Sequence, residues 1–265
     1  SWATTMHRLS GGRFTLGIGR GIGAIYSAFG IPAVTTAQME DFAQVMRRLW
    51  HGELIFNHDG PLGKYPILFL DPDFREDIRL AIVAFGPQTL ALGGREFDDV
   101  ILHTYFTPET LQRAVRTVKD AAEQAGRDPG RVRVWSCFAT VGDHLPEELR
   151  LKKTVARLAT YLQGYGDLLV NTNNWDPAVL QRFRDDPVVQ SVPGGIDHKA
   201  SAEQIEHIAT LIPDEWLEPS ATGSAQQCVD RVRKEFDYGA DAVIMHGATP
   251  DELAPIIGAY RDTVG

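Results

Sequence analysis

An arginine set among four glycines is the first feature of this sequence that could do chemistry. The stretch RFTLGIGRGIGA, residues 13–24, begins with an apolar segment typical of a buried strand at 14–18 and then reaches Gly19, Arg20 and Gly21. Small residues after a strand allow a flat ligand to approach the backbone. An arginine beside them can hold a phosphate through paired hydrogen bonds. The turn is therefore a candidate anion site.

Three interpretations of this turn remain open on the pattern alone. Residues 19–24 satisfy the dinucleotide pattern G-x-G-x-x-G/A, but Gly30 and Pro32 would end the helix that this fingerprint requires, and no acidic residue closes a second strand. A glycine-rich turn needed only for its backbone conformation is the second interpretation. The third is a strand of a (β/α)8 barrel, whose carboxyl end opens onto the active face.

Strands that alternate with helices must position this turn. Apolar runs and helical periodicity predict strands near 14–18, 79–85, 99–103, 132–141 and 242–246, and helices over 37–50, 88–95, 108–125, 147–163, 224–236 and 250–263. Turn signals within 53–78 predict an excursion such as a hairpin, and prolines make 164–219 an irregular segment with short helices near 176–185 and 201–212. The alternation predicts parallel strands with right-handed crossovers, in an open doubly wound sheet or a (β/α)8 barrel.

Composition narrows the class of function. The 265 residues are 43% hydrophobic and 23% charged, which is typical of a globular protein with a sizeable core. A net charge of −9 disfavours nucleic-acid binding, and no apolar run reaches the roughly 18 residues of a membrane span. The two cysteines, Cys137 and Cys228, form no disulfide framework, so we expect a cytoplasmic protein. The histidine spacings are not those of metal sites, and no metal is expected.

Three segments carry a resemblance to a known family. RLSGGRFTLGIGRG, AIVAFGPQTLALGGREFDDVIL and SATGSAQQCVDRVRKEFDYGADAVIMHG occur in this order and resemble the luciferase-like flavin and deazaflavin oxidoreductases. The resemblance covers most of the chain except about 144–219. It implies an α/β fold, a single luciferase-like (β/α)8 TIM barrel over 1–265 with an insertion at about 164–219. Because LSGGRF precedes the fourth strand in this family, we expect the chain to lack about the first three βα units and the natural protein to be longer.

The resemblance also implies a cofactor site, since family members bind FMN or coenzyme F420 at the carboxyl ends of the strands. Arg20 matches the arginine of a family turn that contacts the FMN phosphate, whereas a surface arginine paired with a carboxylate is the alternative. F420-dependent glucose-6-phosphate dehydrogenases carry Thr-Gly-Glu where this chain has Arg20, Gly21 and Ile22, so their substrate is not implied. A second family turn lies at residues 84–89, and a plain strand–helix connection is the alternative interpretation of it. The expected cofactor-binding residues are Gly19, Arg20, Gly21, Ile22, Ala84, Phe85, Gly86, Pro87 and Thr89.

Four further side chains are candidate substrate contacts. His103 and Tyr105 follow the strand at 99–103, and His246 ends the strand at 242–246. Such strand ends are functional positions in barrels, although a hydrogen-bonded structural histidine is the alternative. Trp175 lies in the irregular segment, where it could belong to a substrate lid or fill the core. The acidic pairs 98–99 and 185–186 are expected to be solvated or to cap helices.

These features together predict a redox enzyme that transfers a hydride between F420 and an unknown small organic substrate. An FMN-dependent luciferase-like monooxygenase is the first alternative. A non-catalytic or degraded family member that binds a ligand without turnover is the second. The resemblance implies a homodimer, and the sequence identifies no catalytic residue.

Overall fold

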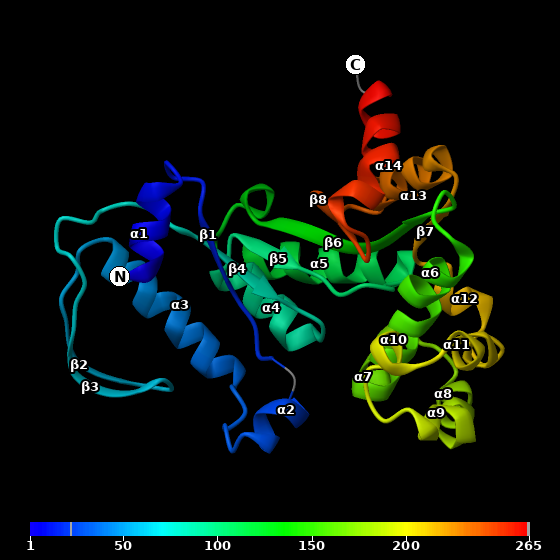
Figure 1. Cartoon of the computed structure of the whole chain (residues 1–265). Helices are drawn as coiled ribbons and strands as arrows, with labels where there is room; N and C mark the ends of the chain where they lie inside the picture. Colours follow the sequence, from blue (N-terminus) through cyan, green and yellow to red (C-terminus); the bar gives the residue numbers. More distant parts are fainter. Residues whose placement is uncertain (22, 264–265) are drawn as a thin grey trace. The chain divides into compact units, whose positions relative to one another are not determined.

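The computed structural model describes residues 1–21 and 23–263 of the chain, which folds into two compact units (Figure 1). The first unit comprises Ser1–Leu102 and Arg116–Val134. The second unit comprises His103–Val115 and the described residues from Trp135 onward. Two elements pass along the chain from one unit into the other, namely α5 (Pro108–Gln124) and β6 (Arg133–Gly142).

Three parallel strands form the sheet of the first unit. β1 (Thr15–Ile18) pairs with β4 (Arg79–Val83), and β4 pairs with β5 (Asp99–Ile101). Leu80 and Ile82 are completely buried, as expected for an apolar run in a parallel sheet that is covered on both faces. The predicted strands near 14–18, 79–85 and 99–103 are confirmed, with ends that differ by a few residues.

Helices α1 (Trp2–Leu9), α2 (Gly23–Ala28), α3 (Thr36–Trp50) and α4 (Pro87–Glu96) complete the first unit, with a 3-10 turn η1 (Pro129–Arg131). The predicted capping box of α3 is present, because the Thr35 hydroxyl accepts from the Gln38 amide over 3.1 Å. α2 ends after six residues, and Gly30 follows it with a φ of +67°. This short helix rules out the dinucleotide interpretation of the glycine-rich turn, which requires a long helix at this point.

An antiparallel hairpin forms a sheet of its own in the first unit (Figure 1). β2 (Ile55–Gly60) pairs with β3 (Gly63–Leu68), which confirms the predicted excursion. Ile55 packs against Val45 and Leu49 of α3, and His58 Nε2 lies 3.0 Å from Asp41 Oδ2. These contacts fix the hairpin against α3.

A buried ion-pair cluster joins the first residues of three strands. Asp99 is 2% exposed, and its two carboxylate oxygens lie 2.9 Å from Arg79 Nε and 2.7 Å from Arg133 Nε. The neighbouring Asp98 accepts from the Leu80 amide over 2.8 Å. The expectation that this acidic pair is solvated or caps a helix is therefore wrong. Asp99 pairs with the arginines that begin β4 and β6, and Asp98 accepts from a backbone amide of β4.

Three parallel strands form the sheet of the second unit. β6 pairs with both β7 (Ala221–Gly223) and β8 (Ala242–His246). Phe138 of β6 packs with Val229 and Val232 of α13 (Ala225–Asp237) and with Ile256 of α14 (Pro250–Asp262). β6 and β8 confirm the predicted strands. β7 was not predicted, because three residues are too few to show a pattern.

The segment between β6 and β7 is more helical than expected. The helix predicted over 147–163 runs as α6 (Glu147–Leu151), the π-helix η2 (Lys152–Ala156) and α7 (Arg157–Asn173). A kink at the non-helical residue Tyr165 lies close to the predicted end, and a helix continues beyond it to Asn173. Prolines begin two of the later helices at their first position instead of interrupting them. The later helices are α8 (Pro177–Asp185), α9 (Pro187–Ser191), α10 (Ile196–Lys199), α11 (Ala202–Ala209) and α12 (Asp214–Leu217).

Candidate functional site

Arg20 lies directly after β1 and places its guanidinium group between two hydroxyls. Its Nη2 donates to Thr36 Oγ1 at the start of α3 and, over 3.2 Å, to Thr89 Oγ1 in the first turn of α4. Its buried Nε has no hydrogen-bond partner among the described residues. No carboxylate in residues 1–21 and 23–263 forms an ion pair with Arg20, so the structure does not support a surface ion pair.

The amino end of α4 adds a second positively polarised group beside Arg20. Gly86 is its N-cap and Pro87 its first residue, and no side chain caps the helix. A Cβ atom added at Gly86 would meet no heavy atom within 4 Å, so open space adjoins this helix end. Pro87 has no N–H and the Thr89 N–H donates to the Gly86 carbonyl over 3.1 Å, so the Gln88 N–H and the helix dipole are what favour an anion at this end. Ala84 is fully buried and Phe85 half-buried, so only the backbone of Ala84 could face a ligand.

Gly19 and Gly21 flank Arg20 and differ in how much room the structure leaves for a larger side chain. Gly21 has a φ of +68°, and a Cβ there would lie 2.5 Å from the Tyr26 ring, so a larger residue would require a rearrangement. A Cβ at Gly19 would contact the Val83 side chain at 3.6 Å, which is ordinary contact. Ile22 lies outside the described residues.

An apolar cavity of 370 Å³ adjoins the same strand end in the first unit. Its walls come from the end of β1, from the segment that follows α2 and from the first half of α3. The residues that line it are Ile18, Gly19, Ile31, Pro32, Ala33, Val34, Gln38, Met39, Phe42 and Leu62. The first unit thus has two features beside the end of β1. One is the Arg20 corner, formed by Arg20 and the start of α4, and the other is the apolar cavity.

His103 lies in the second unit and is held by hydrogen bonds at both ring nitrogens. Nδ1 lies 3.0 Å from the Thr104 carbonyl oxygen, and Nε2 lies 2.7 Å from the Tyr165 hydroxyl. Because a carbonyl only accepts, Nδ1 carries the proton and Nε2 accepts the proton of Tyr165. Burial, and to a smaller extent the charge of His246, lower the pKa of His103 to about 4, although the hydrogen bond with the Thr104 carbonyl opposes the shift. The imidazole is therefore neutral at neutral pH.

Helix α7 supplies side chains around His103 that the sequence analysis missed. Arg157, Tyr161 and Tyr165 recur at a spacing of four, which places them on one face of a helix. The Tyr161 ring meets the His103 ring edge to face at 4.8 Å, and Tyr161 stacks on Tyr165 at 5.5 Å. Burial raises the pKa of both phenols, so they stay protonated. The spacing R-x3-Y-x3-Y was the available signal for this face.

The other two strand-end residues, Tyr105 and His246, also lie in the second unit. Tyr105 is 1% exposed and donates its hydroxyl proton to the Thr154 carbonyl over 3.1 Å. Its own carbonyl accepts from the Asn173 side chain over 2.8 Å. Burial and the nearby Arg157 charge lower the pKa of His246. Tyr105 is thus held in the core, whereas His246 keeps a buried Nδ1 without a partner among the described residues.

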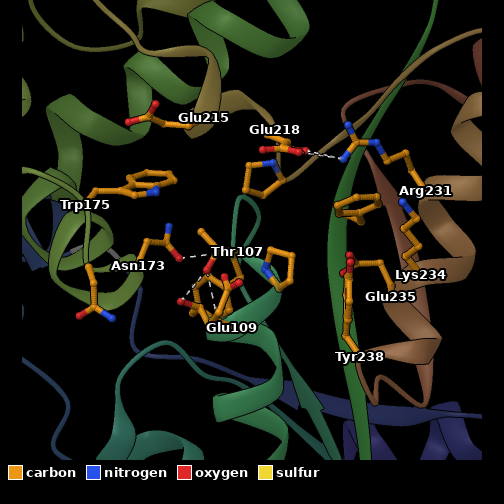
Figure 2. A pocket seen from close by; sticks show the side chains of 16 residues that line it. Thr107, Glu109, Asn173, Trp175, Glu215, Glu218, Arg231, Lys234, Glu235 and Tyr238 are labelled. Atoms are coloured by element: carbon orange, nitrogen blue, oxygen red, sulfur yellow. Dashed lines mark hydrogen bonds and ion pairs between the residues drawn. The ribbon is translucent and has the colours of Figure 1, made fainter.

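Trp175 fills part of the core and also lines a cavity. Its ring stacks parallel on Trp216, with centroids 4.6 Å apart and an interplanar angle of 8°. The cavity beside it measures 610 Å³ and lies within the second unit (Figure 2). Trp175 is thus half-buried, packed on a core tryptophan and open to a cavity.

The residues that the structure describes bear on three other kinds of function, namely metal binding, thiol chemistry and membrane spanning. They contain no group of three or more histidine, cysteine or acidic side chains placed to hold a metal ion. Burial raises the pKa of the Cys137 and Cys228 thiols to about 11, so neither is a thiolate nucleophile at neutral pH. None of the helices in residues 1–21 and 23–263 has the length and apolar character needed to cross a bilayer.

The sequence matches one protein family over most of its length. The model of the luciferase-like monooxygenase family matches residues 2–242, so the chain belongs to this family. The chain is 26% identical over 250 residues to a 5,10-methylenetetrahydromethanopterin reductase from Methanolobus tindarius, an alignment that covers 91% of this chain and 69% of the relative. The resemblance drawn from the three sequence segments is confirmed.

Solved structures share the fold. A coenzyme F420-dependent tetrahydromethanopterin reductase from Methanopyrus kandleri has a TM-score of 0.74 at 18% identity, over 96% of this chain and 74% of that chain. An F420-dependent secondary alcohol dehydrogenase with an F420-acetone adduct has a TM-score of 0.66 at 19% identity, over 98% and 73%. A Pseudomonas putida diketocamphane monooxygenase constituent in complex with FMN has a TM-score of 0.56 at 16% identity, over 96% and 70%. The expected luciferase-like α/β fold is confirmed.

Proposed function

We propose that the chain is an oxidoreductase that binds coenzyme F420 at the strand ends of the first unit. The substrate class is a small organic molecule that exchanges a hydride with the deazaflavin ring, which is the chemistry that this cofactor supplies when bound. The relatives named above act with F420 or reduce organic substrates, which supports the choice of reaction type.

The geometry around Arg20 is the observation on which the proposal rests. A half-buried guanidinium group with two hydroxyl partners and no carboxylate partner in the described chain retains its full positive charge. The uncapped start of α4 points to the same preference for an anion. The residues present therefore fit the phosphate group that F420 and FMN both carry. Arg20, Thr36 and Thr89 would hold that phosphate, and Gly19 and Gly21 would let the cofactor approach the backbone.

FMN is the second candidate cofactor, because the phosphate-binding features do not distinguish it from F420. The arginine-glycine turn resembles the FMN phosphate turn of luciferases. The similar fold of a monooxygenase constituent that holds FMN keeps this alternative open. A homodimer in the cytoplasm, with no nucleic-acid or membrane partner, completes the proposal.

Fluorescence titration tests the proposal directly. F420, FMN and riboflavin, which is FMN without its phosphate, would each be titrated into the protein and into the variant Arg20→Ala. We expect one phosphate-bearing cofactor to bind, and Arg20→Ala to weaken it by about 10- to 100-fold, the contribution of a charged hydrogen bond. Arg13→Ala, which removes an exposed arginine nearby, is the matched control.

Two results would contradict the proposal. Equal affinity for FMN and riboflavin, with no effect of Arg20→Ala on either FMN or F420, would remove the phosphate from the argument. Failure of the protein to bind any of the three compounds would favour a non-catalytic family member.

A further inference from the structure

The 610 Å³ cavity of the second unit has walls that no part of the proposed cofactor chemistry uses (Figure 2). The start of α5, the middle of β6, the ends of α7 and α12 and one side of α13 all contribute to it. Figure 2 shows Trp175 and Asn173 on one side of the cavity. Lys234 and Glu235 of α13, and Tyr238 directly after this helix, lie on the other side. The aromatic residues that line it are Phe106, Phe138, Trp175 and Tyr238.

Glu235 is the unusual residue of this cavity. Glu235 is only 5% exposed, and its Oε2 accepts a hydrogen bond from the Ser136 hydroxyl over 2.5 Å. Among the described residues, no donor contacts its Oε1 and no basic group forms an ion pair with it. Burying a carboxylate without a counter-charge is unfavourable. Burial accordingly raises the pKa of Glu235 to about 7, although the Ser136 hydrogen bond opposes the shift.

The other charged groups around the cavity leave an excess of carboxylates. Glu109 lies at the start of α5, and Glu215 lies on α12. Glu218 is 3.8 Å from Arg231, so those two charges largely offset each other. Lys234 is exposed and has no ion-pair partner among the residues that the structure describes. Apart from the Glu218–Arg231 pair, an ionised Glu235 gives the cavity three carboxylates and one ammonium group, and therefore an excess of negative charge.

We propose that this cavity is a second small-molecule site, which binds an organic ammonium ion against Glu235. The carboxylate of Glu235 supplies the counter-charge through its open oxygen. Aromatic rings attract alkylammonium groups through their negative faces, and the four rings of this cavity are suited to contact the apolar body of such a ligand. The site is distinct from the Arg20 corner, which belongs to the first unit and prefers an anion.

The ligand's charge should couple to the ionisation of Glu235. A quaternary ammonium ion keeps its charge at every pH, so any pH dependence of its binding reports on the protein. With a pKa of about 7, the ionised fraction of Glu235 rises about tenfold between pH 6 and pH 8. The affinity for the cation should rise by a similar factor. The other ionisable side chains that line the cavity are Glu109, Glu215, Glu218, Arg231, Lys234 and Tyr238.

Choline and 3,3-dimethylbutan-1-ol form a suitable pair of probes, because they have the same shape and differ in charge. Each would be titrated into the cofactor-free protein by NMR at pH 6 and pH 8. We expect saturable millimolar binding of choline that strengthens about tenfold at pH 8, and at least tenfold weaker binding of the neutral alcohol at that pH. Glu235→Gln should remove both the preference and the pH dependence. Glu206→Gln on the exposed surface of α11 should leave both unchanged.

A second variant covers the case in which Glu235→Gln perturbs the fold. Trp175→Leu keeps the carboxylate and removes one aromatic wall, so choline binding should weaken while its pH dependence persists. The proposal is overturned if choline does not saturate the protein at pH 8, or if both probes bind equally. It is also overturned if Glu235→Gln binds choline as the wild type does. None of these outcomes depends on whether F420 or FMN binds.

Discussion

The two units each bury a carboxyl group, and the surroundings of the two groups differ. Asp99 in the first unit is 2% exposed and lies between the guanidinium groups of Arg79 and Arg133. Glu235 in the second unit is 5% exposed and has a single hydroxyl partner, Ser136. In the folded protein, two positively charged groups replace the water around Asp99. Around Glu235, one neutral hydroxyl donor and a cavity replace it.

This difference shows that burial alone does not distinguish a structural acid from a binding residue. A paired buried carboxylate is at its most stable when ionised, so it needs nothing further. An unpaired one destabilises the fold when ionised, and a cation that binds beside it would relieve that cost. Substitution should therefore have opposite effects on stability at the two positions.

The largest expected effect is the loss of stability in Asp99→Asn. The amide removes one negative charge from beside two partly buried arginines, which should lower the free energy of unfolding by about 4 kcal/mol at pH 7. Urea unfolding followed by circular dichroism measures this change. Asp120→Asn, on the exposed face of α5, is the control and should change stability by less than about 0.5 kcal/mol. A similarly small loss of stability in Asp99→Asn would show that solvent replaces the carboxylate as a partner of the two arginines.

Glu235→Gln should have the opposite sign at high pH. The folded-state pKa of about 7 lies above the ordinary value of 4.5, so the protonated acid favours folding below pH 4.5 and that advantage is lost as the pH rises through 7. The variant should match the wild type near pH 4.5 and exceed its unfolding free energy by about 3 kcal/mol at pH 8.5. The same urea experiment at the two pH values measures the difference. A variant less stable than the wild type at pH 8.5 would contradict the comparison.

His103 tests the same argument with a base. Its pKa of about 4 lies below the ordinary value of 6.5, so its contribution to stability is present above pH 6.5 and is lost as the pH falls toward 4. The wild type should lose about 2 kcal/mol over this interval because of His103, after allowance for its partial exposure. His103→Gln should lack that loss, whereas His198→Gln, at an exposed histidine, should retain it. Parallel pH profiles for the two variants would argue against a buried neutral imidazole.

Thr89→Val should have the smallest effect and should concern binding only. The valine keeps the shape of the side chain and removes the hydroxyl that accepts from Arg20. Loss of one of the two hydroxyl partners of Arg20, at a cost of about 1 kcal/mol, should weaken the phosphate-bearing cofactor about fivefold, less than Arg20→Ala. Choline binding should stay unchanged, since Glu235 lies in the other unit. An equal loss of choline affinity would mean that the variant disturbs the whole protein.

Much of the fold could be predicted because its signals are local. The apolar run at 79–85 and the capped helix at 37–50 specify their own structure, and both are confirmed as β4 and α3. The helices between β6 and β7 were underestimated, since proline begins a helix as readily as it ends one. β7 is so short that only its pairing with β6 defines it.

The candidate sites were predictable where a motif exists and missed where only packing decides. Arg20 and Thr89 belong to two separate family turns, and the hydrogen bond between them, over 3.2 Å, is consistent with the shared phosphate site proposed for them. In the helix at 224–236, helical spacing would continue the apolar stripe of Val229 and Val232 to Phe236, but Phe236 is 40% exposed and Glu235 is buried instead. Glu235 follows Val232 by three residues, so the stripe itself carried the signal.

The π-helix η2 has a consequence for how this chain tolerates changes in length. Each residue of an α-helix advances it by about 100°, and a π-helix accommodates a residue beyond the regular repeat. Deleting one residue between Lys152 and Ala156 would therefore restore a regular α-helix and leave Arg157, Tyr161 and Tyr165 on nearly the same face, whereas a deletion within α6 would rotate all three by about 100°. No substitution at a single one of these positions would have that effect. The π-helix is thus the place where this stretch can lose a residue without displacing the side chains around His103.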